Sequence, residues 1–500
     1  MPGHGGGDGG SQSRYGLPSC SALTSGARGA GSHRLLIGWR KLASACALWL
    51  RPVTIPRSMS TGEATTGEVR SNVADPVSGS AVFPRGSRVN EAGHLEVGGC
   101  DVVAVAERFG TPAYIYSEDD LRSRARAYLD AFSARSNDFE VLFASKAAPI
   151  TAILRIFSEQ GLSVDVASGG ELHAAISAGF EPARIHMHGN NKSPAELRYA
   201  IDSNVGHIIC DSFDEIGRLD AICADAGHSQ DVLIRITPGI SPDTHSYIQT
   251  GQLDSKFGFG LDDGLAARAV EAVRGSRWLR LVGLHAHIGS QIFELEPYVE
   301  AIEALGGFAG DDCRLLNIGG GLGIAYTAAE EPPSIESYVE TKVRGVERVF
   351  SPVPRILIEP GRSLTGNAGV TAYTVGTVKE IPGVRTYVAV DGGMSDNLRP
   401  MLYGARYDAL LANRAADVAD TTVSIAGMHC ESSDVLIHEV DLPAPRAGDV
   451  LVTPATGAYG HAMANNYNAV RRPPVVFCKD GEARLVVRRE TYDDLLSRDV

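Results

Sequence analysis

The residues of this chain that could do chemistry come directly after short apolar runs. Lys146 follows the run 141–144, and Glu359 follows the run 355–358. Other polar clusters also follow apolar runs, at 168–171, 188–192, 285–291 and 319–323. If the runs are parallel strands, their carboxyl ends meet on one side of the sheet, where the connecting loops can build a site. This spacing predicts one active site assembled from several loops.

Lys146 is unusual because a buried ammonium group is costly unless it is paired or neutralised. A lysine that holds an aldehyde cofactor as a Schiff base avoids that cost. A lone lysine would be better explained as a surface residue, but Lys146 has a candidate partner. Glu359 could hold a protonated pyridine nitrogen and so strengthen the cofactor ring as an electron sink. The alternative is that Glu359 forms a structural ion pair with Arg362.

Three consecutive glycines, Gly319, Gly320 and Gly321, follow the seventh apolar run. Glycine lets the backbone approach a phosphate and turn its N–H groups toward it, ahead of a helix N-terminus. Glycine loops are also common as plain turns. The position after a seventh barrel strand is nevertheless a usual phosphate location, and Ser290 and Tyr459 are candidate donors to the same phosphate.

His285 and His287 are two residues apart, so in a strand they share one face. Such a pair could bind a metal, but the sequence shows no carboxylate or third histidine nearby, and we expect no metal site. We expect His287 to stack as a flat imidazole against a cofactor ring.

Cys430 stands among polar residues in the segment 427–434, whereas an ordinary buried cysteine has apolar neighbours. This setting predicts a thiol exposed to a pocket, with a role in proton transfer. The eight cysteines of the chain include no CxxC pair and no metal-like spacing. They are therefore expected to be free thiols in a reducing compartment.

The elements that must position these residues follow a repeating pattern. From about residue 141, short apolar runs alternate with helical stretches, which indicates βα units and a parallel sheet. Eight such runs predict an α/β fold with a closed (β/α)8 barrel, and the β-branched runs beyond about Gly366 predict a second, β-rich domain. The eight runs are 141–144, 162–166, 184–187, 207–210, 232–236, 281–284, 314–318 and 355–358.

We expect four parts in the chain: a disordered extension at 1–85, a segment at 86–120 that pairs with the β domain, the barrel at 121–365 and the β domain at 366–500. The extension is rich in Gly, Ser, Ala and Thr. It is interpreted either as a transit peptide or as upstream sequence of a protein that starts near Met59.

The composition excludes some classes of protein. A net charge of −14 argues against binding a nucleic-acid backbone. No stretch reaches the roughly 18 to 20 apolar residues of a membrane helix. We expect a cytoplasmic protein, with plastid import as the alternative if the extension is a transit peptide.

Over residues 86–500 the sequence resembles the fold-type III pyridoxal-phosphate decarboxylases, and within them the branch that acts on meso-diaminopimelate. Two departures concern neighbours of the site: Met428 and His429 stand where this family usually has a Gly-Pro start, and Ala148 follows Ala147 where Ala-Asn is common. The motifs that carry the resemblance are 143–146, 164–172, 244–251, 254–258, 287–291, 319–323, 359–362, 430–434 and 457–460.

The resemblance implies an alanine-racemase-like barrel joined to a β domain, in a head-to-tail homodimer with active sites at the interface. Cys430 and Glu431 would then reach the partner subunit's site. The implied cofactor is pyridoxal 5'-phosphate, bound to Lys146. It would be held by Asp165, His287, Ser290, Gly319, Gly320, Gly321, Glu359, Pro360, Gly361, Arg362 and Tyr459. The implied substrate residues are Arg362, Arg399, Tyr403, Glu431 and Tyr459.

The expected reaction is the decarboxylation of meso-2,6-diaminopimelate to L-lysine and CO2, the last step of lysine biosynthesis. Cys430 is the candidate proton donor, with Lys146 or water as alternatives. Decarboxylases of ornithine or arginine need distal carboxylates, whereas Arg362 and Arg399 suit a distal carboxylate and Glu431 a distal amine.

Two further alternatives stay open. An amino-acid racemase of the same fold would need a second base, usually a tyrosine, on the opposite face of the ring, where Cys430 is expected. A regulatory homologue without activity would have no physical need for Lys146, Cys430 and Glu359 together.

Overall fold

The computed structural model describes residues 75–240, 255–310 and 313–500. These residues belong to one compact unit, Ser71–Val500. The motif at 244–251, Asp254 and most of the expected extension lie outside the described residues. Within the described part of the chain, no helix is both long enough and apolar enough to cross a membrane.

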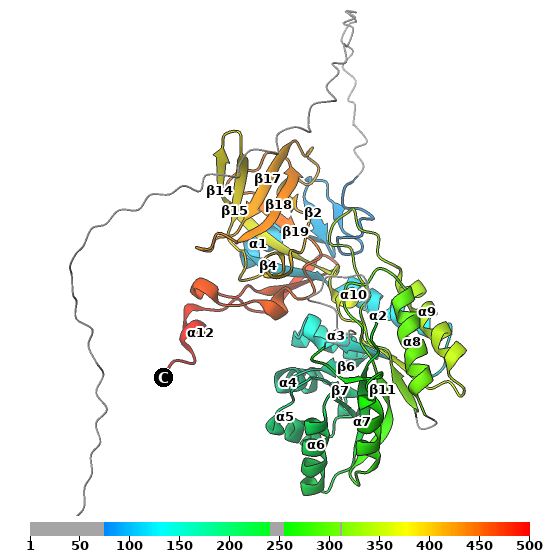
Figure 1. Ribbon diagram of the computed structural model, residues 1–500. Helices are drawn as coiled ribbons and strands as arrows, with labels where there is room; N and C mark the ends of the chain where they lie inside the picture. Colours follow the sequence, from blue (N-terminus) through cyan, green and yellow to red (C-terminus); the bar gives the residue numbers. More distant parts are fainter. Residues whose placement is uncertain (1–74, 241–254, 311–312) are drawn as a thin grey trace, which may run out of the picture. The chain divides into compact units, whose positions relative to one another are not determined.

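Eight parallel strands close into a barrel, part of which is visible at β6, β7 and β11 in Figure 1. Each strand pairs with the next, and the last pairs with the first. The predicted (β/α)8 barrel is therefore confirmed, because each of the eight apolar runs coincides with a strand. The strands are β5 (Phe139–Ala144), β6 (Ser163–Val166), β7 (Ile185–Met187), β8 (His207–Cys210), β9 (Gln230–Thr237), β11 (Leu279–His285), β12 (Leu315–Asn317) and β13 (Arg355–Ile358). A short strand, β10 (Phe259–Gly260), pairs with β9.

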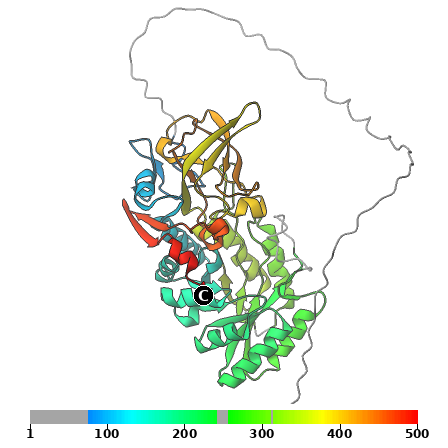
Figure 2. The same ribbon diagram turned by 90° about the vertical axis from the view of Figure 1, so that its left-hand side faces the viewer.

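Helices between and beside these strands in the sequence cover the outside of the barrel (Figures 1 and 2). They are amphipathic, with the apolar side against the strands; α3, for example, buries Ile153, Leu154, Ile156 and Phe157. Serine caps begin several of them, such as Ser168 on α4 and Ser193 on α5. The helices are α2 (Glu118–Ser133), α3 (Thr151–Glu159), α4 (Gly169–Ala178), α5 (Pro194–Asp202), α6 (Phe213–Ala226), α7 (Leu265–Arg274), α8 (Glu296–Phe308), α9 (Ile335–Val349) and α10 (Arg362–Thr365).

The second domain is the expected β-rich one, built on a mixed sheet. Strand β4 (Ala113–Ser117), which precedes the barrel, pairs with β14 and β20 of this sheet rather than with the barrel. In Figure 2, β14 and β15 form the dark yellow hairpin. In order of pairing the sheet contains β18 (Val435–Leu442), β17 (Thr421–Ala426), β15 (Arg385–Val390), β14 (Gly369–Ile381), β4, β20 (Val475–Lys479) and β21 (Glu482–Val487), with β19 (Val450–Thr453) on β14 and β16 (Leu410–Leu411) on β19. Two short helices, α11 (Arg399–Tyr403) and α12 (Tyr492–Leu496), also belong to this part of the chain.

Packing begins earlier in the chain than the expected end of the extension at residue 85. Val77, Val82 and Phe83 are buried in one hydrophobic cluster with the second domain. A small sheet of β1 (Arg88–Val89), β2 (Leu95–Val97) and β3 (Cys100–Asp101) follows, and then α1 (Val102–Phe109). Three apolar side chains are enough to anchor this otherwise Gly- and Ser-rich segment. The expected boundaries at residues 120/121 and 365/366 remain predictions.

Candidate active site

A cavity of about 620 Å³ lies where the loops after the barrel strands meet the second domain. We call it the active-site cavity. It brings together nine of the residues predicted from the sequence, and Cys430 and Glu431 are not among its lining residues. The nine are Lys146, Asp165, His287, Ser290, Glu359, Arg362, Arg399, Tyr403 and Tyr459.

Lys146 lies in the short turn Ser145–Ala147 at the end of β5. Its neighbours Ser145 and Ala147 are buried, whereas its own side chain is accessible from the cavity. Burial lowers the pKa of Lys146, but Asp165, Tyr459 and Glu359 outweigh that effect, and the net pKa is raised. Burial also raises the pKa of Asp165, to about 6. The amine therefore faces the cavity next to a carboxyl group that titrates near neutral pH.

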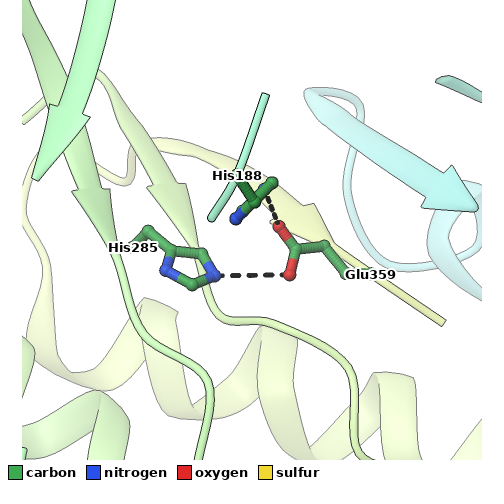
Figure 3. Close-up of side chains that lie close together, drawn as sticks. All are labelled: His188, His285 and Glu359. Atoms are coloured by element: carbon green, nitrogen blue, oxygen red, sulfur yellow. Dashed lines mark hydrogen bonds and ion pairs between the residues drawn. The ribbon is translucent and has the colours of Figure 1, made fainter. Parts of the chain in front are cut away.

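Glu359 lies at the centre of a buried polar cluster, shown in Figure 3. His188 Nε2 lies 2.9 Å from Glu359 Oε1, and His285 Nε2 lies 3.3 Å from Oε2. Asn317 Nδ2 donates to Oε1 at 2.7 Å. The four residues come from the ends of β7, β11, β12 and β13, so closure of the barrel alone assembles the cluster.

The cluster keeps Glu359 ionised. Burial raises the pKa of this carboxyl, but the contacts with His188 and His285 outweigh it and hold the pKa well below its usual range. Burial lowers the pKa of His285 to about 4. At neutral pH the structure therefore pairs the Glu359 carboxylate with the neutral His285 imidazole, which donates to it. An ionised carboxylate is what is needed to accept a hydrogen bond from a protonated ring nitrogen.

The expectation that His285 has no carboxylate or third histidine nearby is wrong. His188, His285 and Glu359 offer three potential metal-ligand atoms within 4.8 Å of one another. These residues are far apart in the sequence and meet because β7, β11 and β13 are brought together when the sheet closes. His287, the other half of the predicted pair, is not in this group.

A second, smaller cavity of about 50 Å³ adjoins Lys146 and is bordered by Gly321, Gly361, Ser290, Tyr459 and Arg362, among others. We call it the small cavity. It offers a backbone amide, hydroxyl groups and a guanidinium, which is the donor set of a phosphate site. Together with a cavity-facing amine and an ionised carboxylate, these residues fit a phosphorylated pyridine aldehyde.

The three glycines contribute unequally to this site. The Gly319 amide donates to Asn317 Oδ1 at 3.0 Å, and the Gly320 amide donates to His287 Nδ1 at 3.2 Å. Of the three, only Gly321 borders the small cavity. The sequence predicted that all three N–H groups turn toward a phosphate, whereas in the structure two of them have partners within the protein.

Two buried arginines line the active-site cavity without a carboxylate partner among the described residues. Arg362 donates to Ser290 Oγ at 2.8 Å and to the Tyr326 hydroxyl, and it lies 4.7 Å from the centre of the Tyr459 ring. Arg399 lies 4.3 Å from the centre of the Tyr326 ring. The ion pair of Glu359 with Arg362 that the sequence left open is not formed by these residues. The two guanidinium groups are therefore suited to an anionic ligand.

Cys430 and Glu431 are exposed on the second domain. They lie in the segment 427–434, which we call the Cys430 turn. The buried Asp434 holds this turn, because its carboxylate accepts from the Met394 amide at 2.7 Å and from the His429 amide at 2.9 Å. Within one chain the structure therefore does not bring Cys430 to Lys146.

Several cavity residues were missed by sequence reasoning. His188 begins a loop after a strand, as Lys146 does, so its position carried the same signal. Arg235 is a charge inside the apolar strand β9 and pairs with Asp211 at 3.4 Å. Tyr326 and Phe257, which also line the cavity, carried no such signal.

Comparisons with known proteins identify the family of this chain. Residues 118–366 match the family model of the pyridoxal-dependent decarboxylases, pyridoxal binding domain. Diaminopimelate decarboxylase of Bacillus subtilis (strain 168) is 51% identical over 427 residues, which cover 83% of this chain and 97% of that protein. The diaminopimelate decarboxylase of Mycobacterium tuberculosis (strain H37Rv) is 42% identical, with coverages of 84% and 98%.

Solved structures give the same result. The crystal structure of diaminopimelate decarboxylase from M. jannaschii in co-complex with L-lysine has a TM-score of 0.78 at 33% identity and covers 83% of this chain and 97% of that one. The lysine/ornithine decarboxylase from Vibrio vulnificus in complex with putrescine, at 22% identity and a TM-score of 0.64, shares the fold. This chain belongs to the diaminopimelate decarboxylase family of pyridoxal-dependent decarboxylases.

Proposed function

We propose that the chain decarboxylates meso-2,6-diaminopimelate to L-lysine and CO2 with pyridoxal 5'-phosphate as cofactor. One observation carries this proposal: Lys146, the ionised Glu359, Arg362 and Arg399 line one cavity. Among the described residues, neither of these two arginines has a carboxylate partner. The relatives that share most of this chain are named diaminopimelate decarboxylase, and one of their solved structures contains L-lysine.

The residues around Lys146 would hold the cofactor. Lys146 would bind it through its amine, and Glu359 would accept a hydrogen bond from its ring nitrogen. Its phosphate would occupy the small cavity. The other candidate cofactor residues are Asp165, His287, Ser290, Gly319, Gly320, Gly321, Pro360, Gly361, Arg362 and Tyr459. When bound, pyridoxal phosphate supplies an electron sink for the electron pair that is left when CO2 departs.

The other end of the cavity would select the substrate. Arg399 and Arg362 would bind the distal carboxylate, with Tyr403 and Tyr459 beside them, and Glu431 would bind the distal amine. Ornithine lacks that carboxylate and would leave buried guanidinium groups without a partner. Each missing partner costs roughly 1 to 3 kcal/mol, so discrimination against ornithine should be strong.

The final step puts a proton in place of the lost carboxylate, and the candidate donor, Cys430, does not line the cavity of its own chain. We propose that Cys430 donates this proton in the partner subunit's site of a head-to-tail homodimer, and that Glu431 acts beside it. The exposure of both residues and their absence from their own cavity support this arrangement. Cys100, Cys210, Cys223, Cys430 and Cys478 are free thiols, which fits a reducing compartment such as the cytoplasm.

The test is release of CO2 by the purified full chain loaded with pyridoxal phosphate. We expect release from meso-diaminopimelate and almost none from ornithine, and the Lys146→Ala variant should lose on the order of 10⁴-fold or more in turnover. Equal release from ornithine would overturn the substrate assignment. Inversion of a stereocentre without loss of CO2 would show a racemase, and full activity of Lys146→Ala would contradict the mechanism.

A further inference from the structure

A buried group of side chains that the reaction does not use directly lies behind the segment 318–321, which we call the glycine loop. Tyr298 comes from α8, and Tyr338 and Lys342 come from α9. Their exposed fractions are 2%, 0% and 0%. Lys342 Nζ lies 4.6 Å from the centre of the Tyr298 ring and 4.4 Å from that of Tyr338. We call these three residues the α8–α9 cluster.

Lys342 has no carboxylate partner among the described residues, which is unusual for a fully buried lysine. Its Nζ instead donates to the carbonyl of Ile318 at 2.7 Å and to that of Gly319 at 2.9 Å. The Tyr338 hydroxyl donates to the next carbonyl, that of Gly320, at 3.0 Å. The cluster therefore binds three consecutive carbonyl groups of the glycine loop from one side.

These bonds also fix the direction of the loop's N–H groups, because the C=O and N–H of one trans peptide point in opposite directions. The Gly319 carbonyl faces Lys342, so the Gly320 amide points away from it and reaches His287 Nδ1. The Gly320 carbonyl faces Tyr338, so the Gly321 amide points the other way, and Gly321 is the glycine that borders the small cavity.

The backbone of this loop packs too closely against its neighbours to accommodate side chains at Gly320 and Gly321. A Cβ on Gly321 would lie 2.7 Å from both the Gly289 carbonyl oxygen and the Tyr298 hydroxyl, and a Cβ on Gly320 would lie 2.2 Å from the Glu359 carbonyl oxygen. Glycine makes the close approach sterically accessible, but it leaves the peptide planes free to rotate. The hydrogen bonds to the α8–α9 cluster restrict that rotation, together with the Glu359 amide, which donates to the Gly319 carbonyl at 3.1 Å.

We propose that Tyr338 and Lys342 are positioning residues of the phosphate site: Tyr338 directs the Gly321 amide into the small cavity, and Lys342 directs the Gly320 amide to His287. This inference rests on the proposed function, because it takes the small cavity as the site of the cofactor phosphate. The role depends on donated hydrogen bonds. Burial lowers the pKa of Lys342 well below its usual value, and a neutral amine still has two N–H groups for the two carbonyls.

The experiment compares two ligands, pyridoxal 5'-phosphate and pyridoxal, by equilibrium titration of the cofactor-free protein. Both ligands can react with Lys146, but only the first has a phosphate. We expect Tyr338→Phe to weaken binding of pyridoxal phosphate roughly 3- to 10-fold and to leave binding of pyridoxal unchanged. Lys342→Met, which keeps an unbranched side chain and removes both donors, should have a smaller effect of the same kind, because Lys342 directs the Gly320 amide to His287 and not into the small cavity.

Tyr298→Phe is the matched control. It removes the same hydroxyl group from the same cluster, but that hydroxyl has no hydrogen-bond partner among the described residues. We expect it to leave the ratio of the two dissociation constants unchanged. If Lys342→Met fails to fold, the two tyrosine variants still decide the question.

The outcomes separate the two proposals. Equal weakening of both ligands by Tyr338→Phe, or an unchanged ratio, would overturn the positioning role. If the wild-type chain bound neither ligand, or bound both equally well, the proposed cofactor site itself would be wrong.

Discussion

The two parts of the proposed site, the barrel mouth and the Cys430 turn, are built differently. At the barrel mouth, Glu359 is buried among His188, His285 and Asn317, and Lys146 faces the active-site cavity. In the Cys430 turn, the thiol and Glu431 are exposed, and only the base of the turn is fixed, by Asp434. One chain therefore brings the candidate cofactor residues together but presents its candidate proton donor outward.

Two buried carboxyl groups, Glu359 at the barrel mouth and Asp396 near the Cys430 turn, also differ in charge state. Glu359 is held ionised by the groups around it. Ser395 contacts His429 of the Cys430 turn at 2.9 Å. The next residue, Asp396, accepts from the Tyr373 hydroxyl at 2.6 Å and from the Gly393 amide at 2.8 Å. Burial nevertheless raises its pKa to about 7. Glu359 thus carries a fixed charge, whereas Asp396, next to the residue that contacts the Cys430 turn, titrates near neutral pH.

Of the variants that compare the two regions, the one that removes the Cys430 thiol should have the largest effect on turnover. Cys430→Ser should lower turnover by roughly 10²- to 10⁴-fold, because a proton-transfer group is lost. Its affinity for pyridoxal phosphate should not change, because Cys430 does not line its own cavity. Turnover and cofactor titration measure the two effects separately.

The control for this variant is Ser433→Ala, an exposed residue of the same turn. It should keep wild-type turnover. A loss of cofactor affinity in Cys430→Ser would show that the thiol takes part in a cofactor site and would contradict the contrast between the two regions.

A smaller effect is expected from the support of Glu359. His188→Leu removes a contact that keeps this carboxyl ionised, so its pKa should rise and the acid limb of the pH–rate profile should move to higher pH. Cofactor affinity should fall roughly 10- to 100-fold, as for other groups that orient a ligating residue. The pH–rate profile and the cofactor titration provide the readouts.

His186→Leu is the matched control, because it removes a buried histidine from the same strand, one that lies 3.4 Å from Glu140 and not near Glu359. It should lower stability without moving the acid limb. An identical shift in both variants would show that loss of packing, and not the contact with Glu359, is responsible.

The substitution of Asp396 should affect stability and not turnover. A carboxyl with a higher pKa in the folded than in the unfolded chain binds its proton more tightly when folded. The folded state is therefore favoured at low pH and loses this advantage as the pH rises from the ordinary value of 3.8 through about 7. The loss amounts to at most about 4 kcal/mol.

The measurement is the free energy of unfolding of the wild type and of Asp396→Asn between pH 4 and 8. The variant cannot titrate, so the wild type should lose stability relative to it as the pH rises across this range. A difference between the two that does not depend on pH would rule out titration of Asp396.

The sequence predicted the barrel well and the site in part, for physical reasons. All eight barrel strands are short apolar runs bounded by polar loops, which is a local signal. Strand β18 (Val435–Leu442) was not predicted, because His438, Glu439 and Asp441 interrupt its apolar pattern. Lys146 and Glu359 could be found because each follows its strand directly.

Contacts across the barrel could not be predicted in the same way. The approach of His188 to Glu359 depends on closure of the sheet between residues 171 positions apart in the chain, and no local pattern encodes that distance. The three carbonyl contacts of Lys342 and Tyr338 are hidden for the same reason, because α9 begins more than ten residues after the glycine loop.

The central claim is that a barrel mouth works with the Cys430 turn of a second copy. It is tested by co-expressing Lys146→Ala and Cys430→Ser chains with different tags and purifying the dimer that carries both. If Cys430 acts in the partner subunit, this hybrid has one intact site, Lys146 from one chain with Cys430 from the other, and should show about half of the wild-type activity. If Cys430 acts within its own chain, neither site is intact, and a hybrid as inactive as the two parent variants would contradict the account.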